Sequence, residues 1–300
     1  MTPFSSNSIV ISIVLGSYNR KAFLISTIEN VRNNQISVPY EIIVIDGGST
    51  DGSMQWLLKQ KDIITIIQHN RGTFKGKKIE RKSWGHFMNL GFKAAKGKYI
   101  LMISDDCLLV PGAVMNGYNY TEQILNSGRK IGAVAFYWRN WPVQNNFWVG
   151  LAYGKLFVNH GFYMREALED VGWIDETNYH FYHADSDVGL KMWDKGYEII
   201  TSPDSYVEHF IHANKKIRST NFVTQPKDWE NYLNKWKELA PKDGINHPEW
   251  LEKEYNDVTN TYTQFPIFER LKYKYLDSKE SFKLILKKRL SKTIIFIKGR

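Results

Sequence analysis

The stretch Tyr99–Pro111 reads Tyr-Ile-Leu-Met-Ile-Ser-Asp-Asp-Cys-Leu-Leu-Val-Pro. Its first five residues are apolar without a polar break, which predicts a short strand buried on both faces of a sheet. The strand ends directly at Ser104, Asp105 and Asp106. Two adjacent carboxylates at the end of a buried strand are costly unless a positive charge lies against them. A hard divalent cation would supply that charge, and the alternative is a strand-to-helix turn in which an aspartate caps the helix.

The segments before this strand favour a ligand site over a simple turn. Apolar, β-branched runs at 9–15, 41–46 and 63–68 predict further strands, and residues at helical spacing between them predict helices. Strands that alternate with helices predict an α/β fold with a mostly parallel sheet and helices on both faces. Asp46 ends the second strand, so Asp46 and Asp106 are expected at the ligand-binding edge of the sheet. No Gly-x-Gly-x-x-Gly follows the first strand, which argues against a nicotinamide cofactor.

Three connecting segments carry more specific expectations. Residues 70–82 are basic and lack periodicity, which predicts a mobile loop. The next helix, 83–96, is expected to end at Gly97 in the left-handed conformation, and a later helix is expected to end at Gly196. The aromatic stretch 138–148 is interpreted as a loop that either stacks on a sugar or packs as part of a lid, and both alternatives stay open.

Composition and charge narrow the class of protein. The chain has 300 residues, is 43% hydrophobic and contains one cysteine, which excludes an internal disulfide framework and fits a reducing compartment. Residues 1–8 contain no basic residue, so no signal peptide is expected, and the run 9–15 is too short to span a bilayer. Residues 281–300 hold seven basic and no acidic residues, which leaves only +2 of the net charge of +9 for the rest. Basicity confined to the tail argues against a nucleic-acid partner.

Five blocks of sequence together resemble the family-2 glycosyltransferases of the GT-A fold, the nucleotide-sugar-dependent and mostly inverting group. Their order is much more specific than any single block, and the resemblance covers about Ser8 to His209. It implies a Rossmann-like GT-A catalytic domain at 8–212, followed by a C-terminal helical, basic extension at 213–300. The blocks are Tyr18-Asn19-Arg20, Ile45–Ser53, Asn89-Leu90-Gly91 with Gly97–Ile100, Ser104–Asp106 with Pro111-Gly112, and Asp175-Glu176 with Asp185–Asp187 through Gly196-Tyr197.

The resemblance implies roles on the donor side of the site. Asp46 matches the carboxylate that holds the nucleotide base or ribose, and Tyr18 lies near the base. Arg20 and Asp105 are assigned to the donor by the same match. Gly47 stands where many members have a second aspartate, which weakens any inference about the nucleotide base.

The resemblance also implies a metal site and a base. Asp106 matches the metal-contacting last acid of the Asp-x-Asp motif, and His209 the late histidine that helps hold the metal or the diphosphate. The implied cofactor is a divalent cation, Mn²⁺ or Mg²⁺. Asp185 matches the catalytic base, with Asp187 and Asp175 as the next candidates. Two further positions depart from the family pattern. Ser104 replaces the first acid of Asp-x-Asp, so Asp105 and Asp106 must carry the ion, and Ala184 replaces the acid that often precedes the base.

The implied function is that of a hexosyltransferase, inverting and non-processive. It would move a sugar from a nucleoside-diphosphate sugar to a hydroxyl of a glycan or lipid-linked acceptor, in polysaccharide or cell-envelope biosynthesis. No Gln-x-x-Arg-Trp sequence occurs, so the processive synthases are not the matching branch. Two alternatives stay open: a catalytically degenerate GT-A-like module at a membrane surface, and a sugar-nucleotide nucleotidyltransferase. The latter would need a Gly-x-Gly-Thr-Arg loop, which residues 16–20 lack.

The basic tail 281–300 is expected to form an amphipathic helix. Its apolar residues recur at helical spacing. Such a helix either lies on an anionic membrane surface or packs on the catalytic domain. Because the cysteine content fits a reducing compartment and no signal peptide is expected, we expect a cytoplasmic protein. A peripheral contact of the tail with the inner face of the membrane stays open. The apolar stripe consists of Phe282, Ile285, Leu286, Leu290, Ile294 and Ile297.

Overall fold

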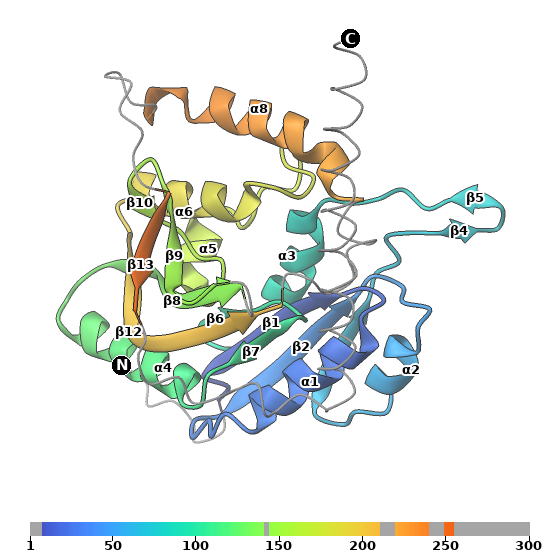
Figure 1. Cartoon of the computed structure of the whole chain (residues 1–300), viewed down its shortest axis with the longest axis horizontal. Coiled ribbons are helices and arrows are strands. Elements are labelled where there is room, and N and C mark those ends of the chain that lie inside the picture. The colour runs from blue at the N-terminus through green and yellow to red at the C-terminus, as the bar shows by residue number, and fades with distance from the viewer. Residues whose placement is uncertain (1–7, 141–143, 211–219, 240–248, 255–300) are drawn as a thin grey trace, which may run out of the picture. The chain divides into compact units, whose positions relative to one another are not determined.

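The computed structural model describes residues 8–140, 144–210, 220–239 and 249–254 (Figure 1). These residues belong to the first of two compact units, Met1–Thr259, and the second unit, Asn260–Arg300, lies outside the described residues. The tail 281–300 therefore cannot be compared with its expected amphipathic helix, and the domain boundary near residue 212 stays a prediction. In the described ranges, no helix combines the length and the apolar content that a bilayer span requires.

One eleven-stranded sheet organises the fold, and four of its strands form a parallel half. β1 pairs with β2 in parallel from Ile11↔Tyr40 to Ser17↔Asp46, so both strands end at the same edge. The loops that follow β1 and β2 consequently meet at that edge. In spatial order the parallel strands are β3 (Ile63–Ile67), β2 (Tyr40–Asp46), β1 (Ile11–Ser17) and β6 (Tyr99–Met102).

The other half of the sheet is mixed. β12 (Glu198–His209) pairs in parallel with β8 and antiparallel with β7 (Cys107–Leu109), and its register shifts between Thr201 and Tyr206. This long strand carries its last residue, His209, to the edge where β6 ends. Beyond β6 follow β11 (Gly161–Met164), β8 (Ile131–Asn140), β9 (Phe147–Ala152) and β10 (Lys155–Leu156), with β13 (Trp250–Lys253) paired to β9. The predicted α/β fold is confirmed, but parallel pairing dominates only one half of the sheet.

Helices cover both faces of the parallel half (Figure 1). The crossovers from β1 to β2 and from β3 to β6 run in opposite directions, so right-handed connections place α1 and α3 on opposite faces. A Cβ atom at Gly91 of α3 would lie 2.5 Å from Ile45 and 2.6 Å from Val14, so glycine permits this close packing. The helices are α1 (Lys21–Arg32), α2 (Ser53–Leu57), α3 (Trp84–Ala94), α4 (Ala113–Asn126), α5 (Arg165–Asp170), α6 (Ala184–Asp194) and α8 (Gln225–Lys235), with 3₁₀ turns at Phe222–Thr224 and Lys237–Leu239.

The two glycines that were predicted to end helices, Gly97 and Gly196, have different backbone conformations. Gly196 has φ +76° and follows α6 in the left-handed conformation, and its N–H donates to the carbonyl of Trp193, as expected. The expectation for Gly97 was wrong, because α3 ends at Ala94 and Gly97 is not among the residues with positive φ. A Cβ at Gly97 would lie 2.6 Å from the backbone nitrogen of Ser12. Close approach of two backbones, and not a left-handed turn, requires glycine there.

Two segments expected to be irregular contain strands. The stretch 70–82 includes a small exposed hairpin, β4 (Thr73–Phe74) and β5 (Lys77–Lys78), which is too short to leave a periodic pattern. The aromatic stretch that begins at Trp138 is not one loop, because β8 continues to Asn140 and β9 starts at Phe147. Within it Phe147 is fully buried and the ring of Trp148 stacks on Trp250 at 4.9 Å. The described aromatic rings of this stretch pack against neighbouring rings, as Trp148 does against Trp138 and Trp250.

Candidate functional site

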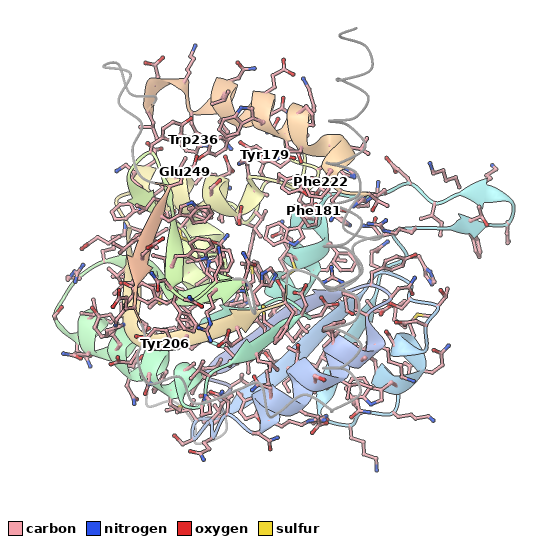
Figure 2. All side chains as sticks on the ribbon, viewed as in Figure 1. Tyr179, Phe181, Tyr206, Phe222, Trp236 and Glu249 are labelled. Carbon is pink, nitrogen blue, oxygen red and sulfur yellow. The ribbon has the colours of Figure 1, made fainter. Side chains whose placement is uncertain are left out.

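A cavity of about 270 Å³ lies at the carboxyl ends of β1 and β6. This is the edge at which open α/β sheets bind ligands. Loops from distant parts of the chain complete the wall, and Figure 2 labels Phe181 and Phe222, which lie near each other on this side of α3. The lining includes Ser17, Tyr18, Arg20, Gly47, Arg71, Arg81, Asp105, Asp106, Asn159, Phe181 and Phe222.

The acidic pair at the end of β6 has a positive partner. Asp105 and Asp106 are 3% and 2% exposed, and Arg20 Nη1 lies 2.8 Å from an oxygen of each. Burial raises the pKa of Asp105 to about 6, Arg20 opposes this rise, and the neighbouring Asp106 adds to it. Arg20, at the start of α1, thus supplies a positive charge that compensates the two buried carboxylates.

The remaining oxygen and nitrogen atoms fit a hard divalent cation. Asp105 Oδ2 is buried and accepts no hydrogen bond from the described part of the chain. His209 Nε2 lies 3.5 Å from Asp106 Oδ1, and His209 Nδ1 lies 2.9 Å from Asn140 Oδ1, which orients the ring. Carboxylate oxygens with one imidazole suit Mn²⁺ or Mg²⁺. The structure therefore brings together the residues assigned to the metal, and their role stays a prediction.

Asp185 lies in the first turn of α6. It does not line the cavity itself, but it contacts a residue that does. Its Oδ2 accepts a hydrogen bond of 2.9 Å from Asn159, which lines the cavity, and its Oδ1 accepts one from the N–H of Ser186. Burial raises the pKa of Asp185, although these hydrogen bonds and His183 oppose the rise. A raised pKa makes a carboxylate a stronger base.

Comparison with known proteins finds similarity to one glycosyltransferase family. Residues 12–141 match the model described as glycosyl transferase family 2. The chondroitin synthase of Pasteurella multocida (strain Pm70) is 22% identical over 237 residues, which cover 64% of this chain and 24% of that protein. TarP of Staphylococcus aureus (strain N315), a poly(ribitol-phosphate) beta-N-acetylglucosaminyltransferase, is 27% identical over 38% of this chain and 33% of that protein. Through residues 12–141 the chain is thus similar to the family-2 glycosyltransferases.

Solved structures agree on the GT-A fold. The mannosyltransferase PcManGT from Pyrobaculum calidifontis, in complex with GDP-Man and Mn²⁺, matches with a TM-score of 0.52 at 18% identity, over 83% of this chain and 70% of that one. S. aureus TarS matches with a TM-score of 0.51 at 13% identity, over 68% of this chain and 37% of that one. The chain spans only a quarter to a third of the length of the two curated relatives.

Tyr18 and Asp46, which were both predicted to contact the nucleotide, are placed differently. Tyr18 lines the cavity, and the guanidinium of Arg71 lies 5.0 Å from the centre of its ring. Asp46 is fully buried and does not line the cavity, because its oxygens accept hydrogen bonds from Gly48 N–H and from the N–H and hydroxyl of Ser49. In this structure Asp46 shapes the loop after β2, and its contact with a nucleotide stays a prediction.

Two arginines of the cavity were not predicted from the sequence. Arg71 and Arg81 both donate hydrogen bonds to Asn221 Oδ1 and to atoms of Thr220, so their partners there are neutral. Both belong to the basic stretch 70–82, which was predicted only as a loop. Its density of basic residues was the available signal, but periodicity could not say which of them face the cavity.

The second missed feature is α8, which holds the wall of the cavity in place. Asp228 accepts hydrogen bonds from the backbone N–H groups of His180, Phe181 and Tyr182, at 2.7, 2.9 and 2.9 Å. Three charge-assisted bonds fix the loop that carries Phe181 into the lining. No motif marked Asp228, because it lies in the segment interpreted as an extension.

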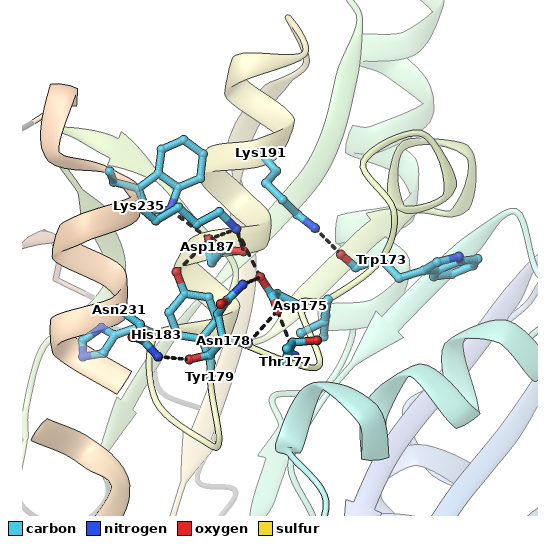
Figure 3. A network of polar contacts seen from close by, with 12 residues as sticks. Trp173, Asp175, Thr177, Asn178, Tyr179, His183, Asp187, Lys191, Asn231 and Lys235 are labelled. Atoms are coloured by element: carbon cyan, nitrogen blue, oxygen red, sulfur yellow. Dashed lines mark hydrogen bonds and ion pairs between the residues drawn. The ribbon is translucent and has the colours of Figure 1, made fainter. Parts of the chain in front are cut away.

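Figure 3 shows a second contact of α8, at the opposite end of this helix from Asp228. There Lys235 forms ion pairs with Asp187 and Asp175. Lys235 Nζ lies 2.7 Å from Asp187 Oδ1, which also accepts hydrogen bonds from Tyr179 and Trp236. Hydrogen bonds from Asn178 and Thr177, together with Lys235, hold the pKa of Asp175 at about 2, although burial alone would raise it. Both carboxylates named as replacement bases are thus engaged in structural contacts.

Proposed function

We propose that this protein is an inverting, non-processive glycosyltransferase that uses a nucleoside-diphosphate sugar as its donor. The observation that carries the proposal is the buried acidic pair, Asp105 and Asp106, which faces a cavity at the carboxyl end of β6. The acceptor would be a hydroxyl of a glycan or of a lipid-linked glycan. Similarity to the family-2 glycosyltransferases and the names of the relatives, among them a chondroitin synthase and TarP, support transfer to a polymer of the cell envelope.

The proposed mechanism assigns one task to each group. Asp105, Asp106 and His209 would hold the divalent cation, which, when bound, neutralises the charge that develops on the diphosphate leaving group. Asp185 takes the proton from the acceptor hydroxyl. At the same time the oxygen of that hydroxyl forms a bond to the anomeric carbon, and the bond between this carbon and the diphosphate breaks. Attack from the face opposite the leaving group inverts that carbon. Arg20 adds a fixed positive charge beside the two carboxylates.

The alternatives are less well supported. A degenerate binding module would not require a carboxylate with a raised pKa next to the cavity, as Asp185 is. A nucleotidyltransferase would need the glycine-rich loop that is missing after β1. Mn²⁺ as the cofactor is favoured by its presence together with GDP-Man in the PcManGT complex. A cytoplasmic location, with or without a membrane contact, remains part of the proposal.

Calorimetric titration with UDP-, dTDP- and GDP-sugars, with and without Mn²⁺, tests the proposal. We expect one nucleotide class to bind only with the cation, and Asp106→Ala to weaken this binding at least ~10-fold. Asp62→Ala is the matched control, because Asp62 is an exposed carboxylate at the amino end of β3 and lies outside the cavity. Wild-type affinity that does not change when the cation is chelated would refute the assignment.

A further inference from the structure

Next to the acidic pair lies a cluster of one thiol and two imidazoles, of which the proposed reaction uses only the imidazole of His209. It consists of Cys107, His160 and His209, and one ligand atom from each lies within 4.8 Å of those of the other two. Cys107 Sγ is 3.7 Å from His160 Nε2. We call these three residues the thiol–imidazole cluster.

The strand pairing creates this cluster. Cys107 of β7 and His209 of β12 are direct partners in an antiparallel ladder. Opposed residues of this kind place their side chains on the same face, with Cβ atoms about 5 Å apart. His160 precedes β11, and its carbonyl accepts a hydrogen bond of 2.9 Å from Phe136 N–H. Backbone hydrogen bonds and register therefore fix all three positions.

His160 indicates that the cluster has a ligand. His160 is only 4% exposed, and within the described ranges the hydrogen-bond partner of its imidazole is the thiol of Cys107. A thiol is a weak donor, whereas buried polar groups normally find strong partners. The ring of Trp138 lies nearly perpendicular to the rings of both His160 and His209, with centroids 5.9 and 5.7 Å away. An imidazole packed against tryptophan, with the thiol of Cys107 and the ring of His209 beside it, is suited to a metal.

We propose that the thiol–imidazole cluster binds a soft divalent cation of the Zn²⁺ class, with Asp106, whose Oδ1 lies 3.5 Å from His209 Nε2, moving in as the fourth ligand. One thiolate, two imidazoles and a carboxylate form a typical tetrahedral zinc set. Bond lengths of about 2.0–2.3 Å require ligand atoms roughly 3.3–3.8 Å apart. The ligand atoms of the cluster all lie within 4.8 Å of one another, so no separation has to shorten by more than about 1.5 Å. The cation replaces the thiol proton of Cys107, which leaves to solvent, and forms the metal–sulfur bond.

Binding there would compete with the donor, a consequence that rests on the proposed function. Asp106 and His209 lie 3.5 Å apart and belong to both sites, since the proposed donor cation uses the same two side chains. An ion held by Cys107 and His160 would draw them away from the diphosphate. The structure thus points to inhibition by zinc at the expense of the Mn²⁺-dependent nucleotide complex.

Cobalt provides a direct test, because a Co²⁺–thiolate bond absorbs in the near ultraviolet and the chain contains a single cysteine. Co²⁺ titration of the full chain should produce this band with one equivalent, and added Zn²⁺ should remove it. We expect no band in Cys107→Ser and at least ~10-fold weaker cobalt binding in His160→Gln. His69→Gln, which changes an exposed histidine outside the cluster, should behave as wild type.

A missing band at saturating Co²⁺ in the wild type, or an unchanged midpoint in His160→Gln, would overturn the site. Circular dichroism establishes that each variant is folded, and His160→Gln keeps the test decisive if Cys107→Ser does not fold. A second titration separates the site from the reaction. One equivalent of Zn²⁺ should weaken Mn²⁺-dependent nucleotide binding in wild type but not in Cys107→Ser. A cobalt band without this competition would refute inhibition and leave the metal site standing.

Discussion

Two aspartates in the first turn of α6, Asp185 and Asp187, should respond in opposite ways to the same substitution. Asp185 touches the cavity through Asn159 and has no lysine or arginine partner among the ion pairs of the described residues. Asp187 is fully buried and lies 2.7 Å from Lys235. Replacing each by asparagine keeps the size of the side chain and removes one carboxylate. The comparison separates a catalytic carboxylate from a structural one.

The structure sets the size of each effect. Asp187→Asn removes one partner of a buried ion pair, which typically costs about 3–5 kcal/mol. Asp175, 3.3 Å from Lys235, still compensates part of the charge, so we expect about 3 kcal/mol and a melting temperature lower by about 6–12 °C. Asp185→Asn removes a carboxylate whose pKa is raised by burial, so its loss should change stability by less than about 1 kcal/mol.

The assay combines thermal melts, donor titration and transfer to a verified acceptor. Asp185→Asn should melt as wild type does, bind the donor normally and lose ~10²-fold or more of the transfer rate. Asp187→Asn should melt lower and keep a residual rate that follows its folded fraction. Wild-type transfer by Asp185→Asn would refute the base assignment. A wild-type melt of Asp187→Asn would refute the structural role of the contact with Lys235.

Other parts of the chain give further tests. Because the pKa of Asp185 is raised and the base must be ionised, transfer should fall as pH drops through that raised value, and a pH–rate profile without an acidic limb above about pH 4 would contradict it. Asp228→Ala frees three backbone N–H groups of the wall, so donor affinity should fall several-fold in calorimetry while the far-ultraviolet spectrum is kept. Gly97→Ala should lower stability by about 1–3 kcal/mol in urea unfolding, because its Cβ would press on the backbone of β1. The full chain should float with anionic liposomes better than a chain truncated at Lys279, and equal partitioning would remove the membrane role of 281–300.

Much of the fold was predictable because it depends on local signals. Apolar runs located β1, β2, β3 and β6, and the two carboxylates after the last of them marked the ligand edge. Ser83 caps α3 through a hydrogen bond from His86 N–H, and Gly196 ends α6, as their residue types indicate. Periodicity and capping act over a few residues, and a single sequence contains that information in full.

Contacts between distant segments were decided only by the tertiary structure. The sequence by itself determined that Asp105 and Asp106 need a positive partner, but nothing local showed that Arg20, about 85 residues earlier, supplies it. In the same way, the register of β12 against β7 sets His209 opposite Cys107, and α8 reaches back to Asp187 across 48 residues. Strand register and helix docking depend on the packing of the whole core. Local sequence patterns therefore predicted which groups need partners, and the assembled sheet decided which partners they have.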